Sequence, residues 1–190
     1  SGLSVPVIGM GTWRTFDVSW PDTGERCRTI VSAALAGGAR LFDTSPMYGR
    51  AERVLSRCLE GRREEALIAT KVWTPVQWHG RRQIEDSFRL WGVDRFDLLQ
   101  VHNMVAWESH LDTLRELKKQ GRIRYIGITT SHGRRLDEME RVLRAEPAFD
   151  FVEVNGIRVR HARRGPERGV PVLLLHGFGG DIGNWLFNLD

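Results

Sequence analysis

The feature that most constrains the fold of this chain is a regular alternation of short apolar runs with longer amphipathic stretches from Val7 to about Val154. The strand candidates are VIGMGTW, RLFDTS, ALIATKVW, FDLLQVH, IRYIGITT and FDFVEV. Most are hydrophobic almost throughout, which is typical of strands that are covered on both faces of a parallel sheet. The alternation therefore predicts an α/β fold with about six parallel strands.

Amphipathic patterns between these runs predict the helices. They cover 25–36, 51–60, 83–90, 108–120 and 134–145, and glycines follow three of them. Leu111, Leu114 and Leu117 recur at a spacing of three, which places them on one face of a helix. We expect that face to be buried as part of the scaffold.

Composition excludes several classes of protein. With 190 residues and 41% hydrophobic content, the chain can bury the core of one ordinary domain. Lys plus Arg exceed Asp plus Glu by only 28 to 24, so no nucleic-acid partner is indicated. No apolar run approaches the roughly 18 residues of a membrane span, and no signal peptide is recognisable. Cys27 and Cys58 lack metal-ligand spacing, so we expect reduced thiols, no metal site and a cytoplasmic protein.

Polar side chains stand at the ends of three consecutive predicted strands. Asp43 ends RLFD, Lys71 ends ALIATK and His102 ends FDLLQVH, while Tyr48 lies in the loop TSPMYG. In a barrel of alternating strands and helices, catalytic residues collect at the carboxyl ends of the strands. We therefore expect these four side chains to lie close together.

These four residue types suit acid catalysis at a carbonyl oxygen. A phenol with a pKa near 10 is a poor acid at neutral pH, and a nearby ammonium lowers that pKa. Asp43 would keep Lys71 charged and fixed, and His102 would orient or polarise the carbonyl oxygen. A lone Lys or Tyr at such a position is more often structural, so the prediction depends on the combination.

The motifs FDTSPMYG, IATKVW and LQVHN, together with VIGMGTW, GRIRYIGITTS and FDFVEVN, resemble the aldo-keto reductase superfamily over about residues 3–154. The resemblance implies an incomplete (β/α)8 TIM barrel over residues 1–153. It also implies reduction of a small-molecule aldehyde or ketone by NADP(H), with Asp43, Tyr48, Lys71 and His102 as catalytic residues. Tyr48 would protonate the substrate oxygen, Lys71 and Asp43 would tune Tyr48, and His102 would orient the substrate.

The same resemblance implies binding residues. Trp13 and Trp73 would wall the substrate pocket with His102, although packing at the rim is a comparable alternative. The cofactor would contact Gly11, Thr12, Asp43, Thr129, Thr130 and Glu153.

The chain departs from the family pattern at the cofactor site. Thr129 and Thr130 stand where the family commonly has a Ser-Asn pair, and Glu153 stands where it has Gln. Counterparts of the seventh and eighth strands, and of the basic loop for the cofactor's phosphates, are not recognisable after Glu153. The alternative is therefore a catalytically impaired or non-catalytic fragment that at most binds cofactor, or an incomplete barrel whose open sheet edges promote association.

Residues 152–190 resemble the beginning of an α/β-hydrolase. A hairpin pattern begins near Asn155, and the apolar run VPVLLLHGFGG follows it, as in a strand that leads into a turn and a helix. We therefore expect a second region over residues 154–190, joined to the first as an engineered chimera, a gene fusion or an artefact of assembly. Because no GxSxG motif is present, ester hydrolysis is the weakest reading. The carbonyl substrate and the oligomeric state stay open.

Overall fold

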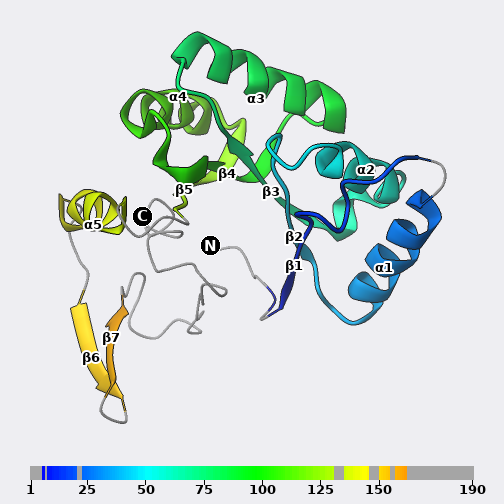
Figure 1. The fold of residues 1–190 in the computed structure, drawn as a ribbon, viewed down its shortest axis with the longest axis horizontal. Helices are drawn as coiled ribbons and strands as arrows, with labels where there is room; N and C mark the ends of the chain where they lie inside the picture. The colour runs from blue at the N-terminus through cyan, green and yellow to red at the C-terminus, as the bar shows by residue number, and fades with distance from the viewer. Residues whose placement is uncertain are drawn as a thin grey trace.

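The computed structural model describes residues 6, 8–20, 23–130, 135–145, 150–154 and 157–161. Its centre is a parallel sheet in which each strand pairs with the next along the chain (Figure 1). The strands are β1 (Gly9–Gly11), β2 (Leu41–Asp43), β3 (Leu67–Val72), β4 (Phe96–Val101) and β5 (Ile123–Ile128). The predicted parallel α/β sheet is confirmed.

Helices alternate with these strands. They are α1 (Gly24–Ala36), α2 (Ala51–Cys58), α3 (Gln77–Trp91), α4 (Trp107–Lys119) and α5 (Leu136–Ala145), with short 3-10 turns η1 (Arg63–Glu65) and η2 (His102–Met104). Consecutive helices from α1 to α4 contact one another, so they form one layer over the sheet. A sequential strand order under a single helical layer is the arrangement of a barrel. A doubly wound sheet would instead reverse its strand order and carry helices on both faces.

The core lies between this helical layer and the strands. Leu111, Leu114 and Leu117 of α4 are all buried, as their spacing predicts. The rings of Phe88 on α3 and Phe96 at the start of β4 pack with centroids 4.8 Å apart. Burial of such side chains contributes on the order of 2 kcal/mol each, so this packing holds α3 and α4 against the strands of the sheet.

Helix α3 begins at Gln77 rather than at Gln83, where the apolar pattern starts. The extra turns contain Gly80, which sequence reasoning treats as a poor helix residue. In the fold Gly80 is required by packing, because a Cβ built there would lie 2.3 Å from Cε1 of His110 on α4. Tertiary contact between α3 and α4 therefore overrides the local propensity.

We expected about six parallel strands, but within the described residues the parallel sheet has five. The segment FDFVEV forms β6 (Asp150–Val154), which pairs antiparallel with β7 (Ile157–His161) and not with β5. The IRVRH segment offers an adjacent antiparallel partner through a short connection, and local pairing wins over addition to the parallel sheet. This hairpin also spans the boundary expected between residues 153 and 154, which stays a prediction.

The hydrolase-like segment VPVLLLHGFGG lies outside the described residues. Among the helices that the structure describes, none combines the length and apolar character that crossing a bilayer requires.

Candidate active site

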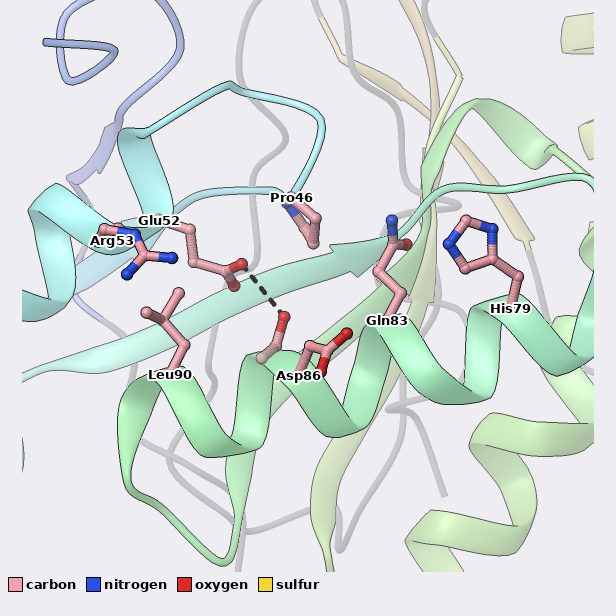
Figure 2. Close-up of a pocket in the computed structure, with 8 residues that line it drawn as sticks. Pro46, Glu52, Arg53, His79, Gln83, Asp86 and Leu90 are labelled. Carbon is pink, nitrogen blue, oxygen red and sulfur yellow. Dashed lines mark hydrogen bonds between the residues drawn. The ribbon is translucent and has the colours of Figure 1, made fainter.

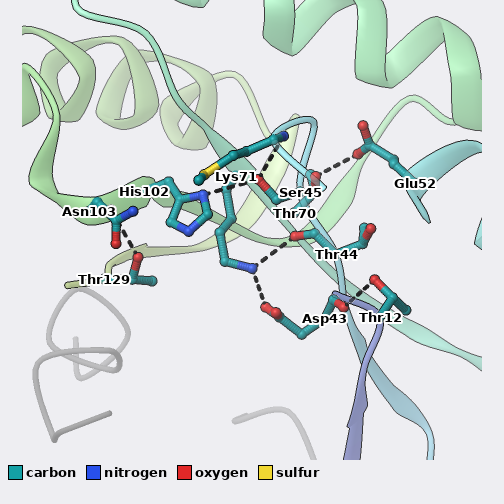
Figure 3. A network of polar contacts seen from close by, with 11 residues as sticks. Thr12, Asp43, Thr44, Ser45, Glu52, Thr70, Lys71, His102, Asn103 and Thr129 are labelled. Carbon is teal, nitrogen blue, oxygen red and sulfur yellow. Dashed lines mark hydrogen bonds and ion pairs between the residues drawn. The ribbon is translucent and has the colours of Figure 1, made fainter. Parts of the chain in front are cut away.

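The four candidate catalytic residues gather at the carboxyl edge of the sheet. Figure 3 shows Asp43, Lys71 and His102 there. Asp43 is the last residue of β2, Lys71 lies near the end of β3, and His102 directly follows β4. Tyr48 lies in the loop between β2 and α2. Parallel pairing of β2, β3 and β4 aligns these strand ends, so residues far apart in the sequence become neighbours.

Lys71 is a buried ammonium with two oxygen partners. Its Nζ donates to Oδ1 of Asp43 at 2.6 Å and to the carbonyl oxygen of Thr44 at 2.8 Å. The Lys71 side chain is 4% exposed, whereas that of Asp43 is 39% exposed. A buried charge is tolerated only when it is paired and hydrogen-bonded, and this pair meets that condition at the rim of the sheet.

Tyr48 packs between the ammonium and two rings. Nζ of Lys71 lies 5.0 Å from the centroid of the Tyr48 ring, within the range of a cation–π contact. The imidazole of His102 meets the same ring edge-on at 5.5 Å, and the indole of Trp13 lies 6.4 Å away. The structure thus brings Tyr48, Lys71, His102 and Trp13 together.

The pKa of Tyr48 moves in the opposite direction to the expected one. Burial raises it above its ordinary value, and the negative charge of Asp43 raises it further. Lys71 does not reverse this because its charge is paired with Asp43 and lies over the ring face. Tyr48 therefore holds its proton at neutral pH, which is the form that a general acid needs.

His102 is a neutral imidazole. It is 7% exposed. Its burial and the nearby Lys71 ammonium lower its pKa to about 4. Its Nδ1 lies 3.1 Å from Oγ of Ser45, a fully buried residue that sequence reasoning missed. The Ser45 hydroxyl is also the acceptor for the N–H of Met47 at 3.2 Å.

The residues expected at the cofactor have mixed surroundings. Thr12 is fully buried, and both its N–H and its hydroxyl donate to the carbonyl oxygen of Asp43, so it ties β1 to β2. Gly11 has open space where a side chain would be. The Thr129 hydroxyl accepts the N–H of Asn103 at 3.1 Å, and Thr130 is buried. The side chain of Glu153 lies outside the described residues.

The loop after β4 has an unusual backbone that sequence reasoning did not foresee. Asn103, Met104 and Ala106 all have positive φ angles, 53°, 51° and 47°, although none is glycine. Besides Thr129, Arg135 holds this loop by donating to the carbonyl oxygens of Asn103 and Met104. Left-handed backbone at non-glycine residues costs energy and persists only where the surroundings enforce it. The loop that begins at His102 is therefore clamped from the β5 side.

The two candidate pocket tryptophans differ in position. Trp13 is 60% exposed and stands beside Tyr48, while Trp73 is 41% exposed in the loop after β3. The backbone of Trp73 is fixed by Gln83, whose amide accepts its N–H at 2.7 Å. Both indoles thus present apolar surface near the carboxyl edge.

A second polar cluster, also missed from the sequence, lies behind the site. Glu52 on α2 is 5% exposed and accepts hydrogen bonds from Thr70, Ser87 and Trp91. Burial raises the pKa of this carboxyl despite these donors. It borders a hollow of about 280 Å³ between α2 and α3, lined also by Pro46, Arg53, His79, Gln83, Asp86, Ser87 and Leu90 (Figure 2). None of the four candidate catalytic residues lines this hollow.

Metal and thiol chemistry find no support in the described part of the chain. It contains no group of three or more His, Cys, Asp or Glu side chains that could hold a metal ion. Cys27 and Cys58 are free and buried, and burial raises the pKa of both thiols. A raised pKa disfavours the reactive thiolate.

Comparison with known proteins gives this arrangement a family context. A sequence profile of the Aldo/keto reductase family matches residues 7–171. The aldo-keto reductase YhdN of Bacillus subtilis is 30% identical over 162 residues, which cover 75% of this chain and 48% of YhdN. The chain thus spans about half the length of this curated relative.

Solved structures give the same context. A putative aldo-keto reductase from Pseudomonas aeruginosa is 30% identical with a TM-score of 0.65, covering 75% of this chain and 60% of that one. An aldo-keto reductase from Klebsiella pneumoniae in complex with NADPH shares the fold at 24% identity and a TM-score of 0.57, covering 72% of this chain and 50% of that one.

One short similarity points elsewhere. A stretch of 46 residues, 24% of this chain, is 59% identical to the dihydrolipoyllysine-residue acetyltransferase component of the acetoin cleaving system of Cupriavidus necator, of which it covers 12%. This match does not confirm a hydrolase-like segment, which stays a prediction.

Proposed function

This chain belongs to the aldo/keto reductase family, and from that premise we propose that it reduces the carbonyl group of a small aldehyde or ketone with NADPH. The observation that supports the proposal most directly is the cluster of a protonated phenol, a buried ammonium and a neutral imidazole at one edge of the sheet. The residues match the chemistry of proton delivery to an oxygen that becomes negatively charged.

The carboxyl edge suits the nicotinamide end of the cofactor in two respects. Gly11 leaves open space at the end of β1, beside Asp43. The Thr129 hydroxyl accepts one hydrogen bond, and within the described residues its own proton has no acceptor. We propose that Gly11, Thr129 and Thr130 hold the nicotinamide. When bound, NADPH supplies a hydride to the carbonyl carbon.

In the proposed mechanism, Tyr48 donates its phenolic proton to the carbonyl oxygen, and the carbonyl becomes an alcohol. The resulting phenolate is stabilised by the ammonium of Lys71, which Asp43 and the carbonyl oxygen of Thr44 hold in place. His102 is neutral and can donate one hydrogen bond to the same carbonyl oxygen, which orients the substrate. Trp13 and Trp73 form apolar walls against which the substrate packs.

The test measures NADPH consumption by absorbance with an activated aromatic aldehyde, and NADPH binding by fluorescence. Replacing Tyr48 by Phe removes only the acidic proton, so kcat/KM should fall by about 10²–10⁴-fold while binding persists. Tyr125→Phe is the matched control, because Tyr125 is the other tyrosine of the chain and lies within β5, outside the cluster of candidate catalytic residues.

Two outcomes would contradict the proposal. Absence of turnover in the unmutated chain would refute reduction, and if NADPH still bound, the chain would be a cofactor-binding module. Equal activity of the Tyr48→Phe and unmutated chains would refute the role given to Tyr48.

A further inference from the structure

Ser45 is buried against the imidazole of His102 in a way that the proposed reduction does not explain. It lies two residues after Asp43, its side chain is fully buried, and its Oγ is 3.1 Å from Nδ1 of His102. Figure 3 shows this contact on the side of the imidazole that faces the loop after β2. The contact matters because a neutral imidazole carries one proton, and the nitrogen that carries it decides where the ring can donate.

The surroundings of Ser45 determine the direction of this hydrogen bond. The N–H of Met47 donates to the Ser45 oxygen at 3.2 Å, so one acceptor position is already used. If Nδ1 of His102 also donated to Ser45, the hydroxyl proton would have no acceptor within the described residues. A buried hydroxyl proton without an acceptor is strongly disfavoured. The arrangement that satisfies every group has the Ser45 hydroxyl donating to Nδ1.

From this geometry we propose that Ser45 is a positioning residue that holds His102 in the tautomer protonated at Nε2. The inference rests on the proposed function, because an Nε2–H is useful only if a substrate oxygen lies beside it. His102 meets Tyr48 edge-on, so its donated hydrogen bond and the Tyr48 proton can converge on one carbonyl oxygen. Ser45 itself contacts His102 and takes no part in the chemistry.

The decisive experiment is nitrogen NMR on the ¹⁵N-labelled full chain, which contains six histidines. The His102 signals are assigned by their loss in His102→Gln. We expect Nδ1 to be unprotonated and hydrogen-bonded and Nε2 to carry the proton. In Ser45→Ala the Nδ1 resonance should move, because the nitrogen loses its donor and the two tautomers can exchange. Ser45→Thr keeps the hydroxyl and should restore the original resonance.

Kinetics supply a second readout. In Ser45→Ala, kcat/KM for the aldehyde should fall about tenfold, which corresponds to the loss of one hydrogen bond of about 1.4 kcal/mol. Ser56→Ala is the matched control, since Ser56 lies on α2 and donates only to the carbonyl oxygen of Leu90. It should leave both kinetics and the His102 resonances unchanged.

A protonated Nδ1 in the unmutated chain would overturn the proposal, even if every Ser45 variant failed to fold. An Nδ1 resonance that is unchanged in Ser45→Ala would overturn it as well. A chain without turnover would refute the proposed reduction, yet the resonances would still decide the tautomer. The two failures are therefore distinguishable.

Discussion

Glu52 offers the sharpest test of how the candidate site is supported. Its carboxylate on α2 joins three elements, because it accepts from Thr70 on β3 at 2.5 Å and from Ser87 and Trp91 on α3 at 3.1 and 3.3 Å. Thr70 directly precedes Lys71, and Glu52 lies four residues after Tyr48. The cluster thus fixes the helix behind Tyr48 to the strand that carries Lys71.

Two substitutions separate the hydrogen bonds from the charge. Glu52→Leu keeps similar volume but leaves three buried donors without an acceptor. At about 1 kcal/mol each, it should be less stable than Glu52→Gln by about 3 kcal/mol. Glu52→Gln can keep the two bonds at Oε1 and reverse the third, so that its amide donates to Ser87. The control Glu64→Gln changes an exposed glutamate of η1 and should shift the free energy of unfolding by less than about 0.5 kcal/mol.

The charge makes the comparison depend on pH. Burial raises the folded-state pKa of Glu52 above its ordinary 4.5, so the folded chain binds this proton more tightly than the unfolded chain does. The resulting stability is fully present below pH 4.5 and is lost as pH rises through the folded-state pKa. Glu52→Gln cannot titrate, so it should become more stable relative to the unmutated chain as pH rises.

Urea unfolding followed by tryptophan fluorescence, repeated from pH 4.5 to 8, measures these differences. Equal free energies of unfolding for the Leu and Gln variants would refute the claim that the three buried hydrogen bonds to residue 52 stabilise the fold. A difference between the Gln variant and the unmutated chain that stayed constant with pH would refute the buried-charge argument.

The remaining predictions concern His102 and Gly80. The depressed pKa of about 4 means that His102 should titrate well below pH 6 in an NMR titration. In the unfolded chain the imidazole has its ordinary pKa near 6.5, so as pH falls the unfolded chain binds this proton before the folded chain does. The free energy of unfolding should therefore decrease as pH falls from 6.5 towards 4. A midpoint near 6.5 would contradict the burial of the imidazole. Gly80→Ala should lower the free energy of unfolding by about 1–3 kcal/mol, since its Cβ would meet His110 at 2.3 Å. Urea unfolding would show this, and a stability gain of the size expected from helix propensity would contradict it.

Strand ends could be predicted from the sequence because an ionisable side chain, whose burial costs free energy, stands at the end of these apolar runs. That logic located Asp43, Lys71 and His102, and the parallel sheet confirms that their strands end side by side. The same logic placed FDFVEV in the parallel sheet, where it failed. An apolar run predicts a strand without naming its partner, and β7 is an antiparallel neighbour close by in the chain.

Ser45 and Glu52 could not be predicted in the same way. A serine before proline reads as a turn residue, and a glutamate in the charged segment RAERVLSR reads as solvated. Glu52 is buried because α2 packs against β3 and α3, and Ser45 is buried where the loop after β2 lies against His102. The positive φ angles of Asn103, Met104 and Ala106 could not be predicted from the sequence either, since none of these positions is a glycine.

The position of Lys71 links these observations. Had its ammonium been unpaired, it would have lowered the pKa of Tyr48, but Asp43 offsets its charge and burial dominates. Tyr48 therefore keeps its proton before reaction, and Lys71 is most useful after the proton has left, when a phenolate would stand beside a fixed ammonium. Such a site depends less on a low ground-state pKa than on rigid placement of the ammonium. Proton transfer from Tyr48 then depends on the groups that hold Lys71 and its strand in place. These are Asp43, the carbonyl of Thr44, and Glu52 through Thr70.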